Sequence, residues 1–139
     1  MGFNIDITNN LNKRLDSLTA EVQQIVKDEL NAFGLETVAM AKNLAPVDIG
    51  FLRNGITYDM PTPLSVEIIS AYNYSAYIEF GTGVFAAAYV PSLPPEIQKY
   101  AMTFFVNGKG RVMARPFLFP AIEFNRIKLI ENLKRELNA

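Results

Sequence analysis

The sequence contains no histidine and no cysteine among its 139 residues. Without cysteine there is neither a disulfide nor a thiolate nucleophile, and without both residues a zinc site would depend on carboxylates alone, which is unusual. An excess of basic residues is also missing, because 13 Lys and Arg face 14 Asp and Glu. A free nucleic-acid-binding protein normally shows a clear basic excess. The composition therefore argues against zinc enzymes, thiol enzymes and freely acting DNA-binding proteins.

Catalytic and phosphate-binding motifs are missing as well. The chain has no GxSxG, HExxH or GxGxxG pattern and no phosphate loop that ends in Lys-Ser or Lys-Thr. Asp48, Asp59 and Glu79 are carboxylates, but their spacing brings no two of them onto one element as an acid–base pair. We therefore predict that the protein is not an enzyme and has no catalytic residue, no metal site and no cofactor.

Long hydrophobic runs are missing too. The longest run, VFAAAYV at 84–90, is far too short to cross a bilayer. The first ten residues lack the basic-then-apolar pattern of a secretory signal. We expect a soluble protein that is made inside the cell and has no membrane partner.

The sequence does have the apolar content of a globular domain, at 50% of its residues. This content and the length predict a single domain over 1–139. Charge is uneven along the chain. Residues 109–139 hold seven Lys or Arg and three Glu, whereas the rest of the chain holds six Lys or Arg and eleven Asp or Glu. Either the two parts offer complementary faces to partners, or they are two solvated helix faces.

Periodicity predicts a long helix over residues 10–43, where apolar residues recur at spacings of three and four. Gly34 lies inside this pattern and indicates either a kink or a close packing contact. Pro46 ends the helix, because the residue before a proline avoids the helical region. A second amphipathic pattern predicts a closing helix over 117–137.

The middle of the chain predicts strands and loops. Residues 55–70 alternate on both sides of a PTP turn and predict a hairpin, with Leu64, Val66 and Ile68 on one face. The stretch that follows is either a third strand or a short helical turn. Glycines and prolines predict an irregular loop at about 83–100 with a short helix near its end, and Asn107-Gly108 then predicts a second hairpin. The fold class is α+β, with an antiparallel-rich β-sheet packed by the N-terminal and C-terminal helices.

The stretch LAPVDIGFLRNGI, at 44–56, predicts a sharp corner between the long helix and the sheet. Pro46 fixes one backbone angle, Gly50 permits a positive φ, and Asp48 can bond nearby backbone amides. Leu52 points back toward the core, and Arg53 lies just beyond the corner. We interpret this stretch as a rigid joint and not as an active-site loop.

Two further stretches have the same character. YSAYIEFGTG places Glu79 between Ile78 and Phe80, so its carboxylate is expected to be half-buried and to need a cationic partner. ARPFLFPAIE places Arg115 before Pro116 at the entry to the last helix. We predict that Arg53 or Arg115 holds Glu79 in bidentate geometry, as an internal clamp.

These three stretches, in this order, resemble a family of tail-completion or head–tail joining proteins from long-tailed bacteriophages and prophages. The motif residues that carry the resemblance or flank it are Pro46, Val47, Asp48, Gly50, Leu52, Arg53, Tyr77, Glu79, Phe80, Gly81, Thr82, Arg115, Pro116, Phe117, Pro120 and Ala121. Ile49 and Gly55 depart from the family pattern, which has Thr and a nearby Ser there. The loop at 83–100 follows no family pattern.

The resemblance implies an α+β structural protein of the virion without catalysis or cofactor. It implies a ring, typically of six copies, at the head-proximal end of the tail. Its partners would be further copies of itself, a tail-tube or tail-terminator protein, and a head connector or adaptor protein. DNA would pass through the ring without specific binding. The protein would be located in the virion neck, and in the host bacterial cytoplasm during assembly.

The loop at 83–100 is too apolar for a free loop and is a candidate interface. Its apolar residues are Val84, Phe85, Tyr89, Val90 and Leu93. We predict that they are mobile in the isolated subunit and become buried against a neighbour in the neck. The alternative is that they cover the protein's own sheet edge.

Two other functions stay open at this point. A tail terminator that caps the tail tube would share the ring geometry. A DNA-binding module, a different class of protein, would need a basic face. The candidates for that face are Arg111, Arg115, Arg126, Lys128, Lys134 and Arg135.

Overall fold

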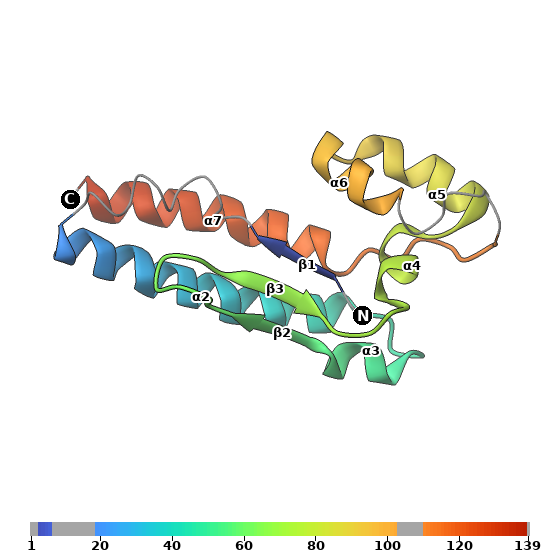
Figure 1. Ribbon diagram of the computed structural model, residues 1–139, viewed down its shortest axis with the longest axis horizontal. Helices are drawn as coiled ribbons and strands as arrows, with labels where there is room; N and C mark the ends of the chain where they lie inside the picture. Colours follow the sequence, from blue (N-terminus) through green and yellow to red (C-terminus); the bar gives the residue numbers. More distant parts are fainter. Residues whose placement is uncertain (1–2, 7–18, 103–109, 139) are drawn as a thin grey trace.

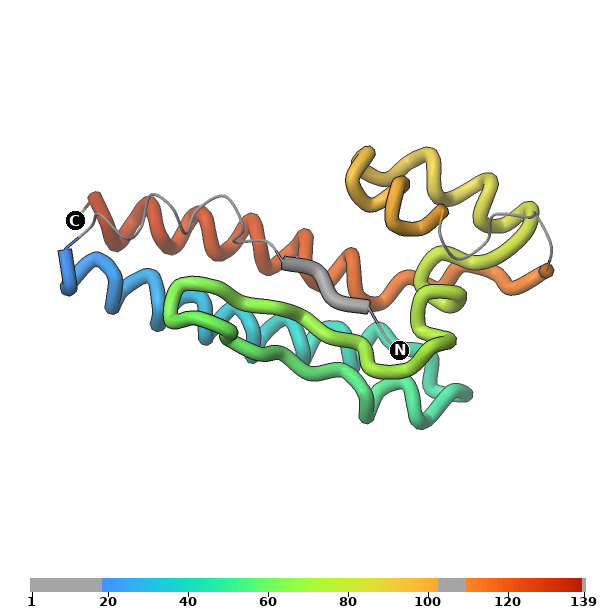
Figure 2. Tube along the Cα trace, viewed as in Figure 1, coloured from blue at the N-terminus to red at the C-terminus, as the bar shows by residue number. Residues whose placement is uncertain are grey.

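The computed structural model describes residues 3–6, 19–102 and 110–138, with only the backbone given for 3–6. Two long helices lie side by side along the molecule, and a small sheet packs beside them (Figure 1). Short helical segments form a cluster at one end, which the Cα trace shows as a separate lobe (Figure 2). The predicted α+β class, with both terminal helices packed on an antiparallel sheet, is confirmed.

Helix α2 spans Ala20–Leu44, and its first turn is capped by Thr19, whose hydroxyl accepts a hydrogen bond from the Val22 N–H at 3.3 Å. The predicted uninterrupted helix over 10–43 is therefore wrong at Thr19, and the part predicted for residues 10–18 lies outside the described residues. Thr19 is extended and bonds the backbone that an uninterrupted helix would bond itself. The end of the helix agrees with the prediction, since Ala45 and Pro46 leave helical geometry.

Helix α7 spans Phe119–Leu137 and runs antiparallel to α2 (Figure 1). Its apolar stripe packs on α2, and the buried residues of the two helices belong to one core cluster. Polar pairs flank this seam: Lys128 bonds Glu36 at 2.8 Å and Asn132 bonds Glu29 at 3.3 Å. One of the basic residues late in the chain thus pairs with an acidic residue of α2 within the same subunit.

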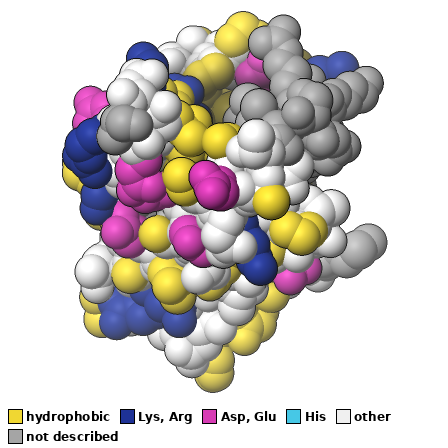
Figure 3. All heavy atoms as spheres, turned by 90° about the vertical axis from the view of Figure 1, so that its left-hand side faces the viewer, with side chains coloured by type: hydrophobic (Ala, Val, Ile, Leu, Met, Phe, Trp, Pro, Cys, Tyr) yellow, Lys and Arg dark blue, Asp and Glu magenta, His cyan; other side chains and the backbone are white. Residues whose placement is uncertain are grey.

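Charges of both signs also alternate on the end of the molecule where α2 begins and α7 ends (Figure 3). Nearer the start of α7, Arg126 pairs with Glu123 of the same helix. A continuous basic face of the kind a DNA-binding module needs is not visible at this end.

The sheet has three antiparallel strands in the order β1-β3-β2, namely β1 (Phe3–Asp6), β3 (Glu67–Ser70) and β2 (Ile56–Asp59). The hairpin of β2 and β3 confirms the prediction, with Ile56 opposite Ser70. The side chains of Leu64, Val66 and Ile68 are buried, as expected for one face. Strand β1 was not predicted from the sequence, because four residues are too few for a periodic pattern.

The lobe consists of α4 (Ser75–Phe80), α5 (Gly83–Tyr89), the 3₁₀ turn η1 (Val90–Ser92) and α6 (Pro95–Ala101). The stretch left open between strand and helix is therefore helical. The irregular loop expected at about 83–100 is also helical, and only the short helix at its end was predicted. The glycines and prolines lie at the boundaries of these helices and so do not interrupt them.

The second predicted hairpin is only partly testable. Its turn, at Asn107-Gly108, lies outside the described residues. Residues 110–117 belong to no helix or strand, and their backbone groups bond Ile78 of α4 and Thr82 just after it. We call residues 110–118 the strip. A short corner helix, α3 (Gly50–Asn54), completes the fold between α2 and β2.

Candidate functional site

The three stretches that the sequence singled out meet at one place, which we call the motif junction. It consists of the corner at 45–54, the residues 77–83 of α4 and its end, and the strip. Figure 1 places these segments together at the end of the molecule that carries the lobe. The motif junction is held mainly by hydrogen bonds between α4 and the strip.

Glu79 lies at the centre of the motif junction and has no solvent exposure. Its Oε2 accepts hydrogen bonds from the N–H groups of Phe117 at 2.8 Å and Leu118 at 2.9 Å, and its Oε1 accepts one from Phe119 at 2.8 Å. These are the free donors at the start of α7, where the helix dipole favours negative charge. Glu79 therefore caps α7 from a distant part of the chain.

The predicted arginine clamp on Glu79 is wrong. The carboxylate is bonded by backbone N–H groups, which can stabilise a buried acid without a cation. Burial nevertheless dominates and raises the pKa of Glu79, with the three N–H groups acting in the opposite direction. Burial, followed by the charge of Glu79, raises the pKa of nearby Tyr89 to about 12.

A sequence signal for this cap was present but was missed. Helix α7 has no Ser, Thr, Asp or Asn before it, since Pro116, Phe117 and Leu118 precede its first residue. A helix that begins without a capping side chain needs acceptors for its first N–H groups from elsewhere in the fold. The fully buried Glu79 is the acceptor that the same motif set supplies.

Arg115 instead binds the corner. Its Nη1 lies 2.9 Å from Oδ1 of Asp48, and both side chains are largely exposed. The hydrogen bond from Arg115 lowers the pKa of the Asp48 carboxyl. The backbone N–H of Arg115 also donates to the carbonyl of Ile78 at 2.8 Å. Arg115 therefore links the strip to both other motifs.

Arg53 and Gly50 do not have the predicted roles. Arg53 is half-buried in α3, and its guanidinium forms no hydrogen bond or ion pair with another described residue. Gly50 begins α3 without a positive φ, so the corner does not need its conformational freedom. The turn is made by Pro46 and by the short helix itself, whose Leu52 is fully buried.

One glycine that the motif junction does require is Gly81. Its φ is +76°, and a Cβ there would lie 2.8 Å from the Ala114 nitrogen and 2.9 Å from the Val112 carbonyl oxygen. Next to it, Thr82 bonds Val112 twice: its N–H donates to the Val112 carbonyl at 2.9 Å, and its hydroxyl accepts from the Val112 N–H at 2.8 Å. A side chain at 81 would push the strip away from these bonds.

The remaining motif residues are core or flanking positions. Phe80 and Phe117 are among the largest fully buried side chains. Pro116 and Pro120 are half-buried on either side of the start of α7, and Pro120 has no N–H to satisfy.

The candidate interface residues at 84–93 are divided by the structure. Val90 and Leu93 are each 6% exposed and belong to the core, so they are not available to a partner. Phe85 and Tyr89 are half-buried. Val84 is 72% exposed and remains available. This division follows from the helical form of the segment, which turns only one side outward.

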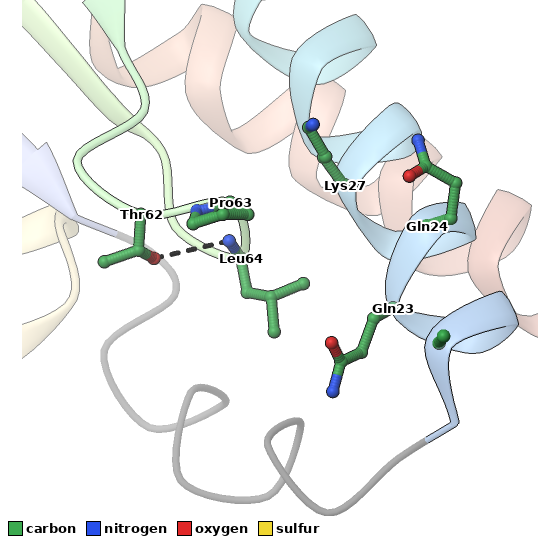
Figure 4. Close-up of a pocket in the computed structure, with 7 residues that line it drawn as sticks. Gln23, Gln24, Lys27, Thr62, Pro63 and Leu64 are labelled. Atoms are coloured by element: carbon green, nitrogen blue, oxygen red, sulfur yellow. Dashed lines mark hydrogen bonds between the residues drawn. The ribbon is translucent and has the colours of Figure 1, made fainter.

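A cavity of about 530 Å³ lies at the opposite end of the molecule, between the first turns of α2 and the β2–β3 turn. The side chains of Gln23, Gln24 and Lys27 face Pro63 and Leu64 across it, and the Thr62 hydroxyl accepts from the Leu64 N–H (Figure 4). The described residues that line it include no acid–base pair. The described residues contain no group of three His, Cys, Asp or Glu side chains that could hold a metal. No described helix is long and apolar enough to cross a membrane.

Comparison with known proteins agrees with this arrangement. Residues 9–81 match the family described as "Bacteriophage HK97-gp10, putative tail-component". Searches of curated proteins and of solved structures found no match. The family match covers more than half of the chain and includes the corner and the α4 motif. The chain therefore belongs to the HK97-gp10-like family of bacteriophage tail components, the head–tail joining or tail-completion family, whose members are structural proteins and not enzymes.

Proposed function

We propose that this protein is a neck component that forms a ring at the head-proximal end of the tail and joins the tail to the capsid connector. The observation that carries the proposal is the motif junction. The three motifs of a phage tail family use their polar groups to fix one chain segment to another, around a carboxylate that no solvent reaches. Such groups are suited to holding a shape under load and not to turning over a substrate.

The ring would contain six copies. On one side it would contact a tail-tube or tail-terminator protein, and on the other a connector or adaptor protein of the head. DNA would pass through its centre without specific binding, consistent with the mixed charges of the surface. The protein would act in the virion, after assembly in the host cytoplasm.

A closed ring is built from heterologous contacts, so each subunit must present two different surfaces. Val84, with the half-buried Phe85 beside it, lies outside these ring contacts and is retained as part of the surface toward another tail or neck protein. Isolated subunits of this kind are expected to be monomeric where each contact is small.

Electron microscopy of lysates from the parent phage, with this gene disrupted and then restored from a plasmid, tests the proposal. We expect filled heads and tails of normal length that lie unjoined, and joined particles after restoration. Tails of uncontrolled length would contradict the joining role and indicate a tail terminator instead. Intact infectious particles without the gene would contradict both roles, and salt-dependent DNA binding would then be the next measurement.

A further inference from the structure

The end of the molecule around the motif junction exposes large apolar side chains. Val47 is 79% exposed, Phe51 72%, Val84 72% and Met113 60%. They come from the corner, α3, the first turn of α5 and the strip, which Figures 1 and 2 place at the same end. We call this surface the junction end. Single exposed apolar residues are ordinary, but several on segments bonded to one another indicate a contact surface.

The described segments of the junction end also carry more positive than negative side chains. Arg53, Arg111 and Arg115 lie on α3 and the strip, and the carboxylate of these segments, Asp48, is already paired with Arg115. Glu79 is fully buried and does not contribute to the surface. Arginine, aromatic and methionine side chains together are the composition that is enriched at the centres of protein interfaces.

The motif junction makes this surface rigid before any partner arrives. Arg115 is held by Asp48 and by the Ile78 carbonyl, and Val112 is held twice by Thr82. A surface that is already ordered loses little conformational entropy on binding. The bonds that hold the fold at this end therefore also prepare the exposed side chains for contact.

We propose that the junction end docks a different virion protein, whose surface carries carboxylates around an apolar centre. A second copy of this chain is the less suitable occupant, because the described surface of the opposite end mixes both signs of charge (Figure 3). The proposal rests on the tail role of the family and deepens the joining role proposed above.

Crosslinking in purified particles tests the proposal without relying on the joining role. The chain has no cysteine, so Val84→Cys creates a single attachment point for benzophenone maleimide. The matched control is Leu35→Cys on α2, which is 56% exposed and lies away from the junction end. We expect irradiation to join position 84, and not position 35, to another virion protein through a peptide that contains Asp or Glu beside apolar residues. Exclusion of Val84→Cys from particles that accept Leu35→Cys would support the same surface.

Crosslinks from position 84 to a second copy of this chain, or no crosslink at all, would overturn the proposal.

A complementation assay gives the second measurement. Phe51→Asp and Arg111→Glu are expected to lower the yield of infectious particles about tenfold or more, whereas Leu35→Asp and Lys99→Glu leave it unchanged. Equal yields for all four variants, with wild-type protein active, would overturn the proposal and leave the joining role intact. If the wild-type protein does not restore infectious particles, that result would instead contradict the joining role. The crosslinks would then be the only test of the docking surface.

Discussion

Glu79 takes the place that a serine or an aspartate beside the helix takes at many helix starts. Its two oxygens accept from three N–H groups, those of Phe117 and Leu118 just before α7 and that of Phe119, the first residue of the helix. Because the acceptor comes from α4, the cap is also a tertiary link between the lobe and the long helix pair. One side chain thus sets both the start of an element and the position of its neighbour.

Replacing Glu79 with glutamine tests this double role. The amide has one acceptor oxygen, so at least one buried N–H would face an NH₂ group. We expect the free energy of unfolding to fall by about 1–3 kcal/mol, measured by urea denaturation. Glu123→Gln is the matched control, because Glu123 lies on α7 and its side chain pairs with the partly exposed Arg126 of the same helix. Equal stabilities of both variants would contradict the capping role.

The pH dependence of stability follows from the same residue. Burial raises the pKa of Glu79 above its ordinary value of 4.5, so between that value and the raised pKa the folded chain binds a proton that the unfolded chain has released. The free energy of unfolding therefore falls as the pH rises through this window. We expect the stability difference between wild type and Glu79→Gln to narrow as the pH rises from 4.5. A difference that widens over this range would contradict the direction of the shift.

The contribution of Asp48 to stability has the opposite pH dependence. Arg115 lowers its pKa below 3.8, so its contribution is present above that pH and is lost as the pH falls through the lowered pKa. Both partners are exposed, so this contribution is expected to be small.

At the scale of elements, helix α2 is shaped by what packs against it. A Cβ at Gly34 would overlap the ring of Tyr58 on β2, whose hydroxyl donates to Asn31 Oδ1 of the same helix at 2.7 Å. Of the two readings of Gly34, the close packing contact is thus the correct one. The sheet approaches the helix so closely because this position has no side chain.

Alanine substitutions at Gly34 and at Gly50 separate the effect of packing from the effect of helix propensity. Alanine favours a helix over glycine by about 1 kcal/mol, and at Gly50 no other heavy atom lies within 4 Å of the added Cβ. We expect Gly50→Ala to be neutral or slightly stabilising and Gly34→Ala to be destabilising by about 1–3 kcal/mol. Thermal unfolding followed by circular dichroism measures both. A stabilised Gly34→Ala would show that the ring of Tyr58 moves aside at no cost.

At the scale of the whole molecule, the lobe and the helix–sheet body share one core. The buried cluster includes Leu30 of α2, Ile68 of β3, Phe80 of α4, Ala86 of α5 and Leu129 of α7. The motif junction adds hydrogen bonds across the same boundary. The two parts are separate in outline but continuous in their packing.

A continuous core predicts one cooperative unfolding transition. The loss of helix followed by far-ultraviolet circular dichroism should coincide with the transition followed by tyrosine fluorescence. Tyr58, Tyr77 and Tyr89 report from both parts of the molecule. Two separate transitions would contradict the single domain expected for the chain, and would show that the lobe unfolds by itself.

The long apolar periodicities were enough to predict α2 and α7, because the stripe of each helix is a local property of its own sequence. The hairpin of β2 and β3 was predictable for the same reason, from its alternation and its turn residues. The short helices of the lobe were not, because their glycines and prolines are the same residues that mark loops. Only their burial on α4 and on one another distinguishes helices such as α5 from an irregular loop.

The sequence by itself determined the fold class, the family and the three stretches that meet in the motif junction, since each depends on residue types and their order. Tertiary structure decided which residue bonds which. Arg115 binds Asp48, and Glu79 binds the first N–H groups of α7 and not an arginine. The physical reason is that a buried carboxylate accepts backbone and side-chain donors alike, and only the folded chain shows which donors lie within reach.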